Sequence, residues 1–448
     1  MSSAKIVGRK KSGVDKIYQM PYNSNDMLRS MEVQGAIMVT KEERLTDVLG
    51  IIDKLDISPS MYRDSVEKYK AIGTFLSSKG INADFYPQGS FSLGTVVRPY
   101  KNNQDASFDL DAVCQIEINK EDTDPREIKR MVEKAFDDDE TYSGKLEKFD
   151  KCCTIRYADI GGIGFSIDIV PSVKEDQGTI LELMGKSHNP NLVVSSIAIT
   201  DVSDEVYEWA TNNPKGYKVW FDKINSEFLA SNPIRNRRMM FEANRSIFAS
   251  IEDIPIELER SALQRVIQIL KRHRDVYFSK MADGDNLKPL SAIITIVVAM
   301  ISQVAPSNLP VFDLLRFVLN EFDIYSQRQI LNESQFTFKY GVKNVIQRPG
   351  GVWKLENPAN PKDNFVDSWN SNSLLSKAFF NWIKQANSDF IQSVEKSDRE
   401  FYAQLGASFG FETTRQIIKE SKYSAVQPLV TLSRESQSKP WGAECGDQ

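Results

Sequence analysis

The spacing of apolar residues predicts a small sheet mixed with helices in the first half of the chain and mainly helices in the second half. From Tyr62 to Leu76, apolar residues recur every three or four positions, as on one face of an amphipathic helix. Ser58 and Pro59 suit the start of this helix, and Gly80 suits its end. The same reasoning predicts helices from about residue 41 and over residues 125–136, 259–278, 290–304, 311–322 and 374–394.

Short apolar runs in the first half predict strands. Gly161 and Gly162 indicate a tight turn between the last two of them. Residues 348–364 are rich in Pro, Asn and Gly, so we expect a loop there. The expected fold class is α+β, with strands at residues 83–86, 108–113, 152–157 and 164–170.

The strand predicted at residues 108–113 carries two acidic residues. Because successive side chains of a strand point to opposite faces, Asp109 and Asp111 share one face and the apolar residues beside them share the other. Two carboxylates held this close repel each other, and a divalent cation is the usual compensation. Asp168 stands on the polar face of another predicted strand. These three acids are the candidate metal ligands.

Composition narrows the chemistry further. The 448 residues include only two histidines and have a net charge of −5, so a His-rich metal site, a Ser-His-Asp triad and a generally basic nucleic-acid surface are not expected. The four cysteines, Cys114, Cys152, Cys153 and Cys445, have neither metal-ligand spacing nor a disulfide framework. We therefore expect a reducing, cytoplasmic setting. Catalysis should depend on carboxylates and metal ions.

A Gly-Ser turn precedes the acidic strand by about twenty residues. Gly89 lets the backbone approach a ligand closely, and Ser90 offers a hydroxyl and an amide to phosphate. The P-loop pattern is absent from the sequence. Alone, such a turn is more simply a loop, and an Asp-x-Asp pair is more simply a solvated strand face. Their order along the chain, followed by a lone strand Asp, favours a two-metal site for phosphoryl or nucleotidyl transfer.

The apolar run from residue 290 to 301 is too short to span a bilayer, so we expect a buried helix there and no membrane association.

The chain is expected to divide into four parts. Residues 1–40 are polar and read as an N-terminal arm, and 413–448 as a C-terminal tail. Between them we expect a catalytic lobe over residues 41–230 and a helical lobe over residues 231–412.

Three stretches together resemble the polymerase-β-like nucleotidyltransferase superfamily: QGSF at residues 88–91, FDLD at 108–111 and SIDIVP at 166–171. More narrowly, the chain resembles the cGAS/DncV-like nucleotidyltransferases (CD-NTases) of bacterial anti-phage (CBASS) signalling. NPKGY at 213–217, LQR at 263–265, ILKRHRD at 269–275 and KPLSAIIT at 288–295 support this resemblance. NPANP at 357–361 echoes a loop of oligoadenylate synthases. The resemblance covers about residues 60–400.

The resemblance implies a bilobal enzyme that joins nucleoside triphosphates (ATP, GTP, CTP or UTP) into a cyclic di- or trinucleotide second messenger, with release of pyrophosphate. Asp109, Asp111 and Asp168 would hold two Mg²⁺ ions, with Mn²⁺ as an alternative. The nucleotide would be bound by residues of both lobes. The resemblance also implies a monomer whose product acts on a downstream effector, with no nucleic acid as substrate. The implied nucleotide-binding residues are Gln88, Gly89, Ser90, Lys271 and Ser291.

Other interpretations stay open. The same fold could transfer a nucleotide to RNA or to a protein, or could serve as a non-catalytic nucleotide-binding regulator. Lys271 and Arg272 could form a solvated helix face, and His273 reads as a structural hydrogen-bonding residue. A cluster of arginines could contact nucleotide, although a solvated basic face is the simpler interpretation; it comprises Arg235, Arg237, Arg238 and Arg245.

Overall fold

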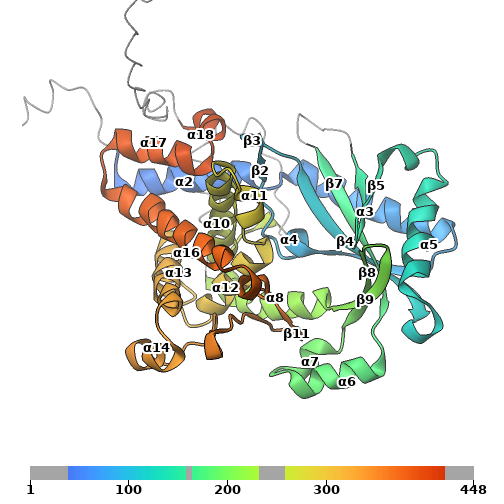
Figure 1. Cartoon of the computed structure of the whole chain (residues 1–448). Helices are drawn as coiled ribbons and strands as arrows, with labels where there is room; N and C mark the ends of the chain where they lie inside the picture. The colour runs from blue at the N-terminus through green and yellow to red at the C-terminus, as the bar shows by residue number, and fades with distance from the viewer. Residues whose placement is uncertain (1–38, 158–163, 232–257, 419–448) are drawn as a thin grey trace, which may run out of the picture. The chain divides into compact units, whose positions relative to one another are not determined.

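The structure is a computed structural model that describes residues 39–157, 164–231 and 258–418 (Figure 1). The chain divides into two units, residues 1–40 and 41–448, and the description below concerns the second. The predicted N-terminal arm, the turn at Gly161 and Gly162, the arginine cluster at 235–245 and most of the C-terminal tail lie outside the described residues.

The described strands form one large mixed sheet in the order β1-β4-β7-β6-β5, with β8 paired to β7 and β9 paired to β8. Among the described strands of this sheet, only β4 and β7 run parallel to each other. They lie side by side and carry the three predicted acids. The strands are β1 (Ala83–Gln88), β4 (Phe108–Asn119), β5 (Leu146–Lys148), β6 (Cys153–Arg156), β7 (Phe165–Lys174), β8 (Ile197–Ser203) and β9 (Val206–Asn212).

Helices α3 (Pro59–Ser78) and α5 (Pro125–Asp137) pack on one face of this sheet. Helix α3 begins where expected, because the Ser58 side chain accepts a hydrogen bond from the amide of Met61 and proline occupies the first turn. Its apolar stripe joins the apolar residues of β4 and β7 in one buried core. The aspartates of β4 therefore project from the other face of the sheet.

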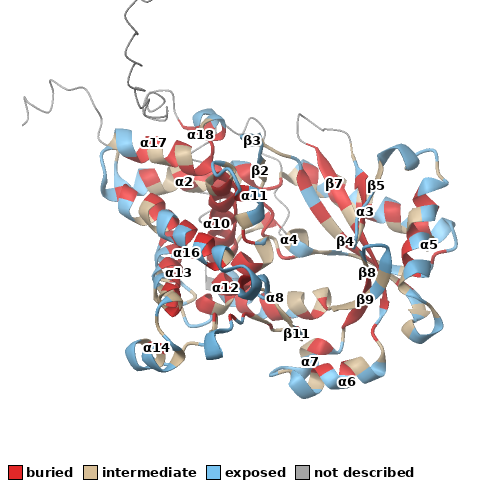
Figure 2. Ribbon diagram, in the orientation of Figure 1, coloured by how far each residue is buried: buried red, intermediate tan, exposed pale blue. Residues whose placement is uncertain are grey.

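A second group of helices surrounds α10 (Ala262–Ser279), which is buried over almost its whole length (Figure 2). Helix α2 (Lys41–Leu55) packs with this group, since Arg44 donates hydrogen bonds to the carbonyls of Val394 and Lys396. The other members are α8 (Pro214–Ser231), α11 (Gly284–Leu287), α12 (Ser291–Ser302), α13 (Val311–Ser326), α14 (Glu333–Tyr340), α16 (Ser373–Asn387), α17 (Asp398–Phe409) and α18 (Phe411–Ile417).

The α+β fold class and the mainly helical second half are confirmed, and each predicted strand and long helix is present. Strand β4 continues to Asn119, past the predicted end at residue 113, and β5, β8 and β9 were not predicted. By length and composition, one described segment, Gly284–Ser302, would be able to cross a membrane. Core helices meet the same criterion, and most of α12 is buried, as predicted for this apolar run.

Several details of the sequence interpretation are wrong. The segment predicted as loop at residues 348–364 contains a two-stranded hairpin, β10 (Glu356–Asn357) and β11 (Asn360–Asn364). Its prolines are tolerated because the hairpin is not part of the main sheet. The helix predicted to reach residue 394 changes at Ser388 into a π-helical turn, and α18 extends to Ile417, past the predicted start of the tail. A hairpin also forms where no strand was predicted, β2 (Tyr100–Lys101) and β3 (Gln104–Asp105).

Candidate active site

Asp109 and Asp111 lie on the same face of β4, as the alternation predicts: Phe108, Leu110 and Ala112 are buried, whereas the two aspartates are exposed and half-buried. Because β4 and β7 pair in parallel, Asp168 stands directly beside Asp111 in the register. The sheet thus brings together acids that are 57 or more residues apart in the sequence.

The Asp109 and Asp168 carboxylates contact different partners. The Asp109 side chain accepts a hydrogen bond from the Ser166 hydroxyl at 3.1 Å and lies 3.5 Å from the Lys101 ammonium. Asp168 accepts a hydrogen bond from the Thr154 hydroxyl at 2.6 Å. In the described chain, no three His, Cys, Asp or Glu side chains are already grouped so that they could hold a metal ion. The three acids are therefore not grouped in this way, and Asp109 lies beside Lys101.

The charges nevertheless act on one another strongly. Burial, followed by the neighbouring Asp168 and Asp109, raises the pKa of Asp111 to about 7, and Lys271 opposes this rise. Burial likewise raises the pKa of Asp168, against the hydrogen bond from Thr154. The site therefore brings three carboxyl groups together, and Lys101 and Lys271 offset part of their mutual repulsion. Oxygen donors of this kind match the preference of Mg²⁺ and Mn²⁺.

The Gly-Ser turn lies against the acids. Gln88, the last residue of β1, pairs with Asp111 across the sheet, and Gly89 opens the short helix α4 (Gly89–Ser92) with a φ of +62°. A Cβ atom at Gly89 would collide with the Oδ2 atom of Asp111. Glycine is required here both by the left-handed backbone and by the close approach of the carboxylate. Ser90 follows next to the acidic pair.

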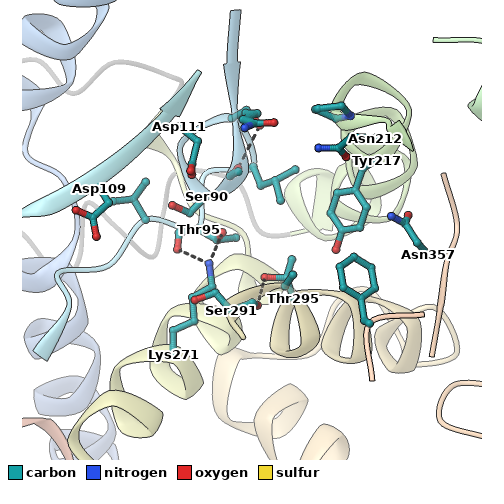
Figure 3. A pocket seen from close by; sticks show the side chains of 18 of the residues that line it. Ser90, Thr95, Asp109, Asp111, Asn212, Tyr217, Lys271, Ser291, Thr295 and Asn357 are labelled. Atoms are coloured by element: carbon teal, nitrogen blue, oxygen red, sulfur yellow. Dashed lines mark hydrogen bonds between the residues drawn. The ribbon is translucent and has the colours of Figure 1, made fainter. Parts of the chain in front are cut away.

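A cavity of about 910 Å³ opens in front of these residues (Figure 3). Of the eight predicted site residues, Asp168 alone does not line it, although it adjoins Asp111. The seven that line the cavity are Gln88, Gly89, Ser90, Asp109, Asp111, Lys271 and Ser291. Its volume is sufficient for a nucleotide-sized ligand.

Lys271 reaches this cavity from α10. Its side chain is buried, and its ammonium donates hydrogen bonds to the hydroxyl of Thr95 at 3.1 Å and to the Thr95 carbonyl at 3.4 Å. Burial and, to a lesser extent, Arg274 lower the pKa of Lys271 to about 7, although Asp111 opposes this. The alternative that Lys271 and Arg272 form a solvated helix face is wrong, because both are buried.

Polar residues along α10 also fasten the helix to the segment after α4. Gln264 donates to the Leu93 carbonyl at 2.9 Å, and Gln268 donates to the Val96 carbonyl at 2.6 Å. His273, on another side of α10, hydrogen-bonds to Asp389 and Trp382, which confirms its structural role. Lys271 is therefore held in place by its neighbours on the same helix.

Ser291 begins α12 and meets Arg274. The guanidinium of Arg274 donates to the Ser291 hydroxyl at 2.8 Å and to the Pro289 carbonyl at 3.0 Å, and it also pairs with Asp275. Lys288 lines the cavity nearby. The wall formed by α10 and α12 is thus cationic and faces the acidic wall formed by β4.

Sequence reasoning did not assign several residues that line the cavity. Lys101 lies on β2, and only the tertiary structure brings it to Asp109. Tyr217 and Asn357 line a different part of the cavity from Asp109 and Lys271 (Figure 3), and Phe365 also lines the cavity. Tyr217 and Asn357 belong to the stretches that carried the family resemblance, which was their only signal.

The comparisons with known proteins agree with this geometry. Residues 83–170 match the family model described as "Cyclic GMP-AMP synthase DncV-like, nucleotidyltransferase domain". A protein of Roseivirga ehrenbergii named c-di-GMP synthase is 27% identical over 336 residues, which are 73% of this chain and 73% of that protein.

Two solved structures share the fold. The Bradyrhizobium diazoefficiens CD-NTase CdnG in complex with GTP has a TM-score of 0.58 and 18% identity, over 84% of this chain and 97% of that one. Escherichia coli MS115-1 CdnC with ATP has a TM-score of 0.52 and 14% identity, over 82% and 97%. The fold, the match over residues 83–170 and the acidic cavity define a nucleotidyltransferase. The chain is similar to the DncV-like CD-NTases, and its residues 83–170 match their nucleotidyltransferase domain.

Proposed function

We propose that this nucleotidyltransferase joins two nucleoside triphosphates into a cyclic dinucleotide and releases pyrophosphate. The observation that carries the proposal is the cavity itself, where Asp109 and Asp111 face Lys271 and Ser291. Such a cavity suits a substrate that combines metal-bound phosphates with a sugar hydroxyl. The name of the Roseivirga relative, c-di-GMP synthase, supports a dinucleotide product, and the GTP and ATP complexes of CdnG and CdnC support triphosphate substrates.

Asp109, Asp111 and Asp168 are proposed to hold two Mg²⁺ ions, with Mn²⁺ as an alternative. Their oxygen donors and the mutual repulsion of their carboxyl groups fit these cations. When bound, the ions would acidify the attacking hydroxyl and neutralise the leaving pyrophosphate. Asp168, which stands beside Asp111 in the register, is proposed to accept the proton of the attacking hydroxyl.

The remaining predicted residues are proposed to hold the triphosphate. Gly89 and Ser90 offer backbone and hydroxyl groups beside the acids, and Gln88 precedes them on β1. From the opposite wall, Lys271 offers a point charge on a long stem, and Ser291 offers a hydroxyl that Arg274 orients. A nucleotide bound between these walls would contact both the main sheet and the helices around α10.

The cellular role that we propose is the one that the family resemblance implies. We propose that the protein acts in the cytoplasm as a monomer in anti-phage defence and that its product activates a separate effector. The domain division is likewise a proposal: a catalytic lobe over residues 41–230 and a helical lobe over residues 231–412. The first boundary coincides with the end of α8 (Pro214–Ser231).

The test is turnover with labelled ATP, GTP, CTP and UTP plus Mg²⁺. We expect released pyrophosphate and a product that resists phosphatase, identified by mass spectrometry. Asp109→Asn and Asp111→Asn should abolish both. Asp313→Asn, which changes an exposed carboxylate paired with Arg316 on α13, is the control. A labelled RNA or protein as the only product would instead support transfer to a macromolecule. Metal-dependent nucleotide binding without turnover would support a regulator.

A further inference from the structure

Asp363 is a carboxylate of the cavity that the proposed catalytic groups do not use. It lies on β11 and belongs to the cavity lining together with Asn357, with which it is hydrogen-bonded. Figure 3 shows Asn357 and Tyr217 on the opposite side of the cavity from Asp109 and Lys271. A nucleotide whose phosphates lie at the acidic and cationic walls would extend its other end toward these residues.

The charge of Asp363 is not balanced within the described chain. Its Oδ2 atom accepts one hydrogen bond, from the Asn357 amide at 3.1 Å, and no ion pair of the described residues includes it. Asp275, another carboxylate of the lining, is paired with Arg274. A free carboxylate repels a polyanionic substrate unless it meets hydrogen-bond donors on that substrate. Asp363 is therefore suited to N–H groups of a ligand.

Asn357 holds this carboxylate in place. Its side chain is buried, its Nδ2 atom donates to Asp363, and its Oδ1 atom accepts from the amide of Ala359 at 3.0 Å. Because both ends of the amide are engaged, Asn357 cannot rotate freely. The carboxylate of Asp363 is thus oriented before any ligand arrives, which reduces the entropy lost on binding.

The adjoining lining suits a flat ring. Tyr217 and Phe365 are in edge-to-face contact with ring centroids 6.4 Å apart, and both line the cavity. Phe365 is two residues beyond Asp363 on the same chain segment. The buried hydroxyl of Tyr217 makes no hydrogen bond within the described residues. Aromatic faces beside unsatisfied polar atoms match a nucleobase, which has an apolar face and a polar edge.

We infer that Asp363, oriented by Asn357, selects guanine nucleotides by accepting hydrogen bonds from the adjacent N1–H and N2–H groups of the base. Guanine alone among the common bases places two N–H donors side by side on its Watson–Crick edge, and a carboxylate accepts both. Adenine and cytosine pair their single amino group with a ring acceptor that a carboxylate repels. This inference rests on the proposed function for the position of the phosphates, and it adds the base that the site prefers.

The test compares GTP, ITP and ATP on the full chain, by equilibrium binding and by pyrophosphate release. ITP lacks only the 2-amino group of GTP. We expect the wild type to prefer GTP over both. Asp363→Asn should weaken the binding of GTP by roughly ten- to a hundredfold and bring the affinities for GTP and ITP close together. It should also raise the use of ATP relative to GTP, because an amide complements adenine. Asp313→Asn should leave all three unchanged. Asp363→Ser serves as the second variant if Asp363→Asn does not fold.

The outcomes separate the inference from the proposed function. Guanine selectivity that Asp363→Asn removes, in a protein that releases no pyrophosphate, would support the inference and overturn the proposed synthase activity. Pyrophosphate release with an unchanged ratio of GTP to ATP in the variant would overturn the inference and leave the activity intact. A wild-type protein that binds ATP as tightly as GTP would also overturn it.

Discussion

Arg272 and Asp105 form an ion pair with an Nη2–Oδ1 distance of 2.5 Å, although they are 167 residues apart. The guanidinium is completely buried, lies over the ring of Tyr100, and also donates to the Phe409 carbonyl. Asp105 additionally accepts from the Thr413 hydroxyl. This pair therefore fixes the β2–β3 hairpin to α10 and to the C-terminal helices. The same hairpin carries Lys101, which faces Asp109.

The first prediction concerns this ion pair. Asp105→Asn leaves a buried guanidinium without its counter-charge, so we expect the free energy of unfolding to fall by about 2–4 kcal/mol. Urea denaturation measures the change. The exposed pair of Asp313 and Arg316 provides the comparison, because Asp313→Asn should cost less than about 1 kcal/mol. Equal effects at the two sites would contradict the role given to Asp105.

The second prediction concerns Lys101 and metal binding. The Lys101 ammonium lies 3.5 Å from the Asp109 carboxylate and neutralises negative charge that would otherwise attract a metal cation. Replacing it with Met removes this competitor, so the Mg²⁺ or Mn²⁺ concentration that gives half of the maximal thermal stabilisation should fall several-fold. Lys218→Met, on the exposed side of α8, should leave that concentration unchanged. Weaker metal binding by the Lys101 variant would show that Lys101 does not compete with the metal.

Local patterns in the sequence predicted part of the site, whereas residues placed by long-range contacts could not be predicted. Asp109 and Asp111 were recognisable because strand alternation is a local property, and Gly89 because a turn is local too. The assignment of Asp168 to the site depended on the order of the motifs along the chain, because its pairing with Asp111 is set by β7. The contacts of Lys101 with Asp109 were beyond local reasoning. Helix α10 was predicted, but the burial of its Gln268 and Lys271 side chains could not be, because carbonyls of a distant segment accept their hydrogen bonds.

The third prediction concerns Gly89. Gly89→Ala forces a Cβ atom against the Asp111 carboxylate and strains a backbone at φ +62°, so we expect at least a hundredfold loss of turnover together with about 1–3 kcal/mol of destabilisation. Gly185→Ala on α6 (Gln177–Lys186), where nothing lies within 4 Å, should be neutral or stabilising. Steady-state kinetics and thermal melting check both. Retained turnover in the Gly89 variant would contradict the required close approach.

The fourth prediction concerns acid sensitivity. Burial opposes ionisation of Asp56, but Arg260 and Arg265 outweigh it and lower the pKa of this carboxyl. The folded state therefore binds this proton less readily than the unfolded state, and the resulting stabilisation is present above about pH 4 and lost as the pH falls below it. Asp56→Asn should lower stability at pH 7 and flatten its pH dependence between about pH 3 and 5. Parallel curves for variant and wild type in urea denaturation would contradict this.

The last prediction concerns the proton on Lys271. Burial lowers its pKa to about 7, so at pH 8 most of the free protein carries a neutral amine there. A bound triphosphate favours the ammonium, and GTP binding at pH 8 with EDTA should therefore take up close to one proton. The γ-phosphate contributes little because its own pKa is about 6, as for phosphate esters. Calorimetry in two buffers of different ionisation enthalpy measures this uptake.

Lys271→Met should remove most of that uptake and weaken GTP binding. The uptake should also shrink at pH 6, where the amine is already protonated, so that affinity falls as the pH rises through 7 in the wild type only. Asp111 is the other group whose pKa lies near 7, and an approaching anion would raise it further. Asp111→Asn separates the two contributions, because it should leave the uptake by Lys271 in place. Uptake that persists in Lys271→Met and disappears in Asp111→Asn would assign the proton to the acid instead.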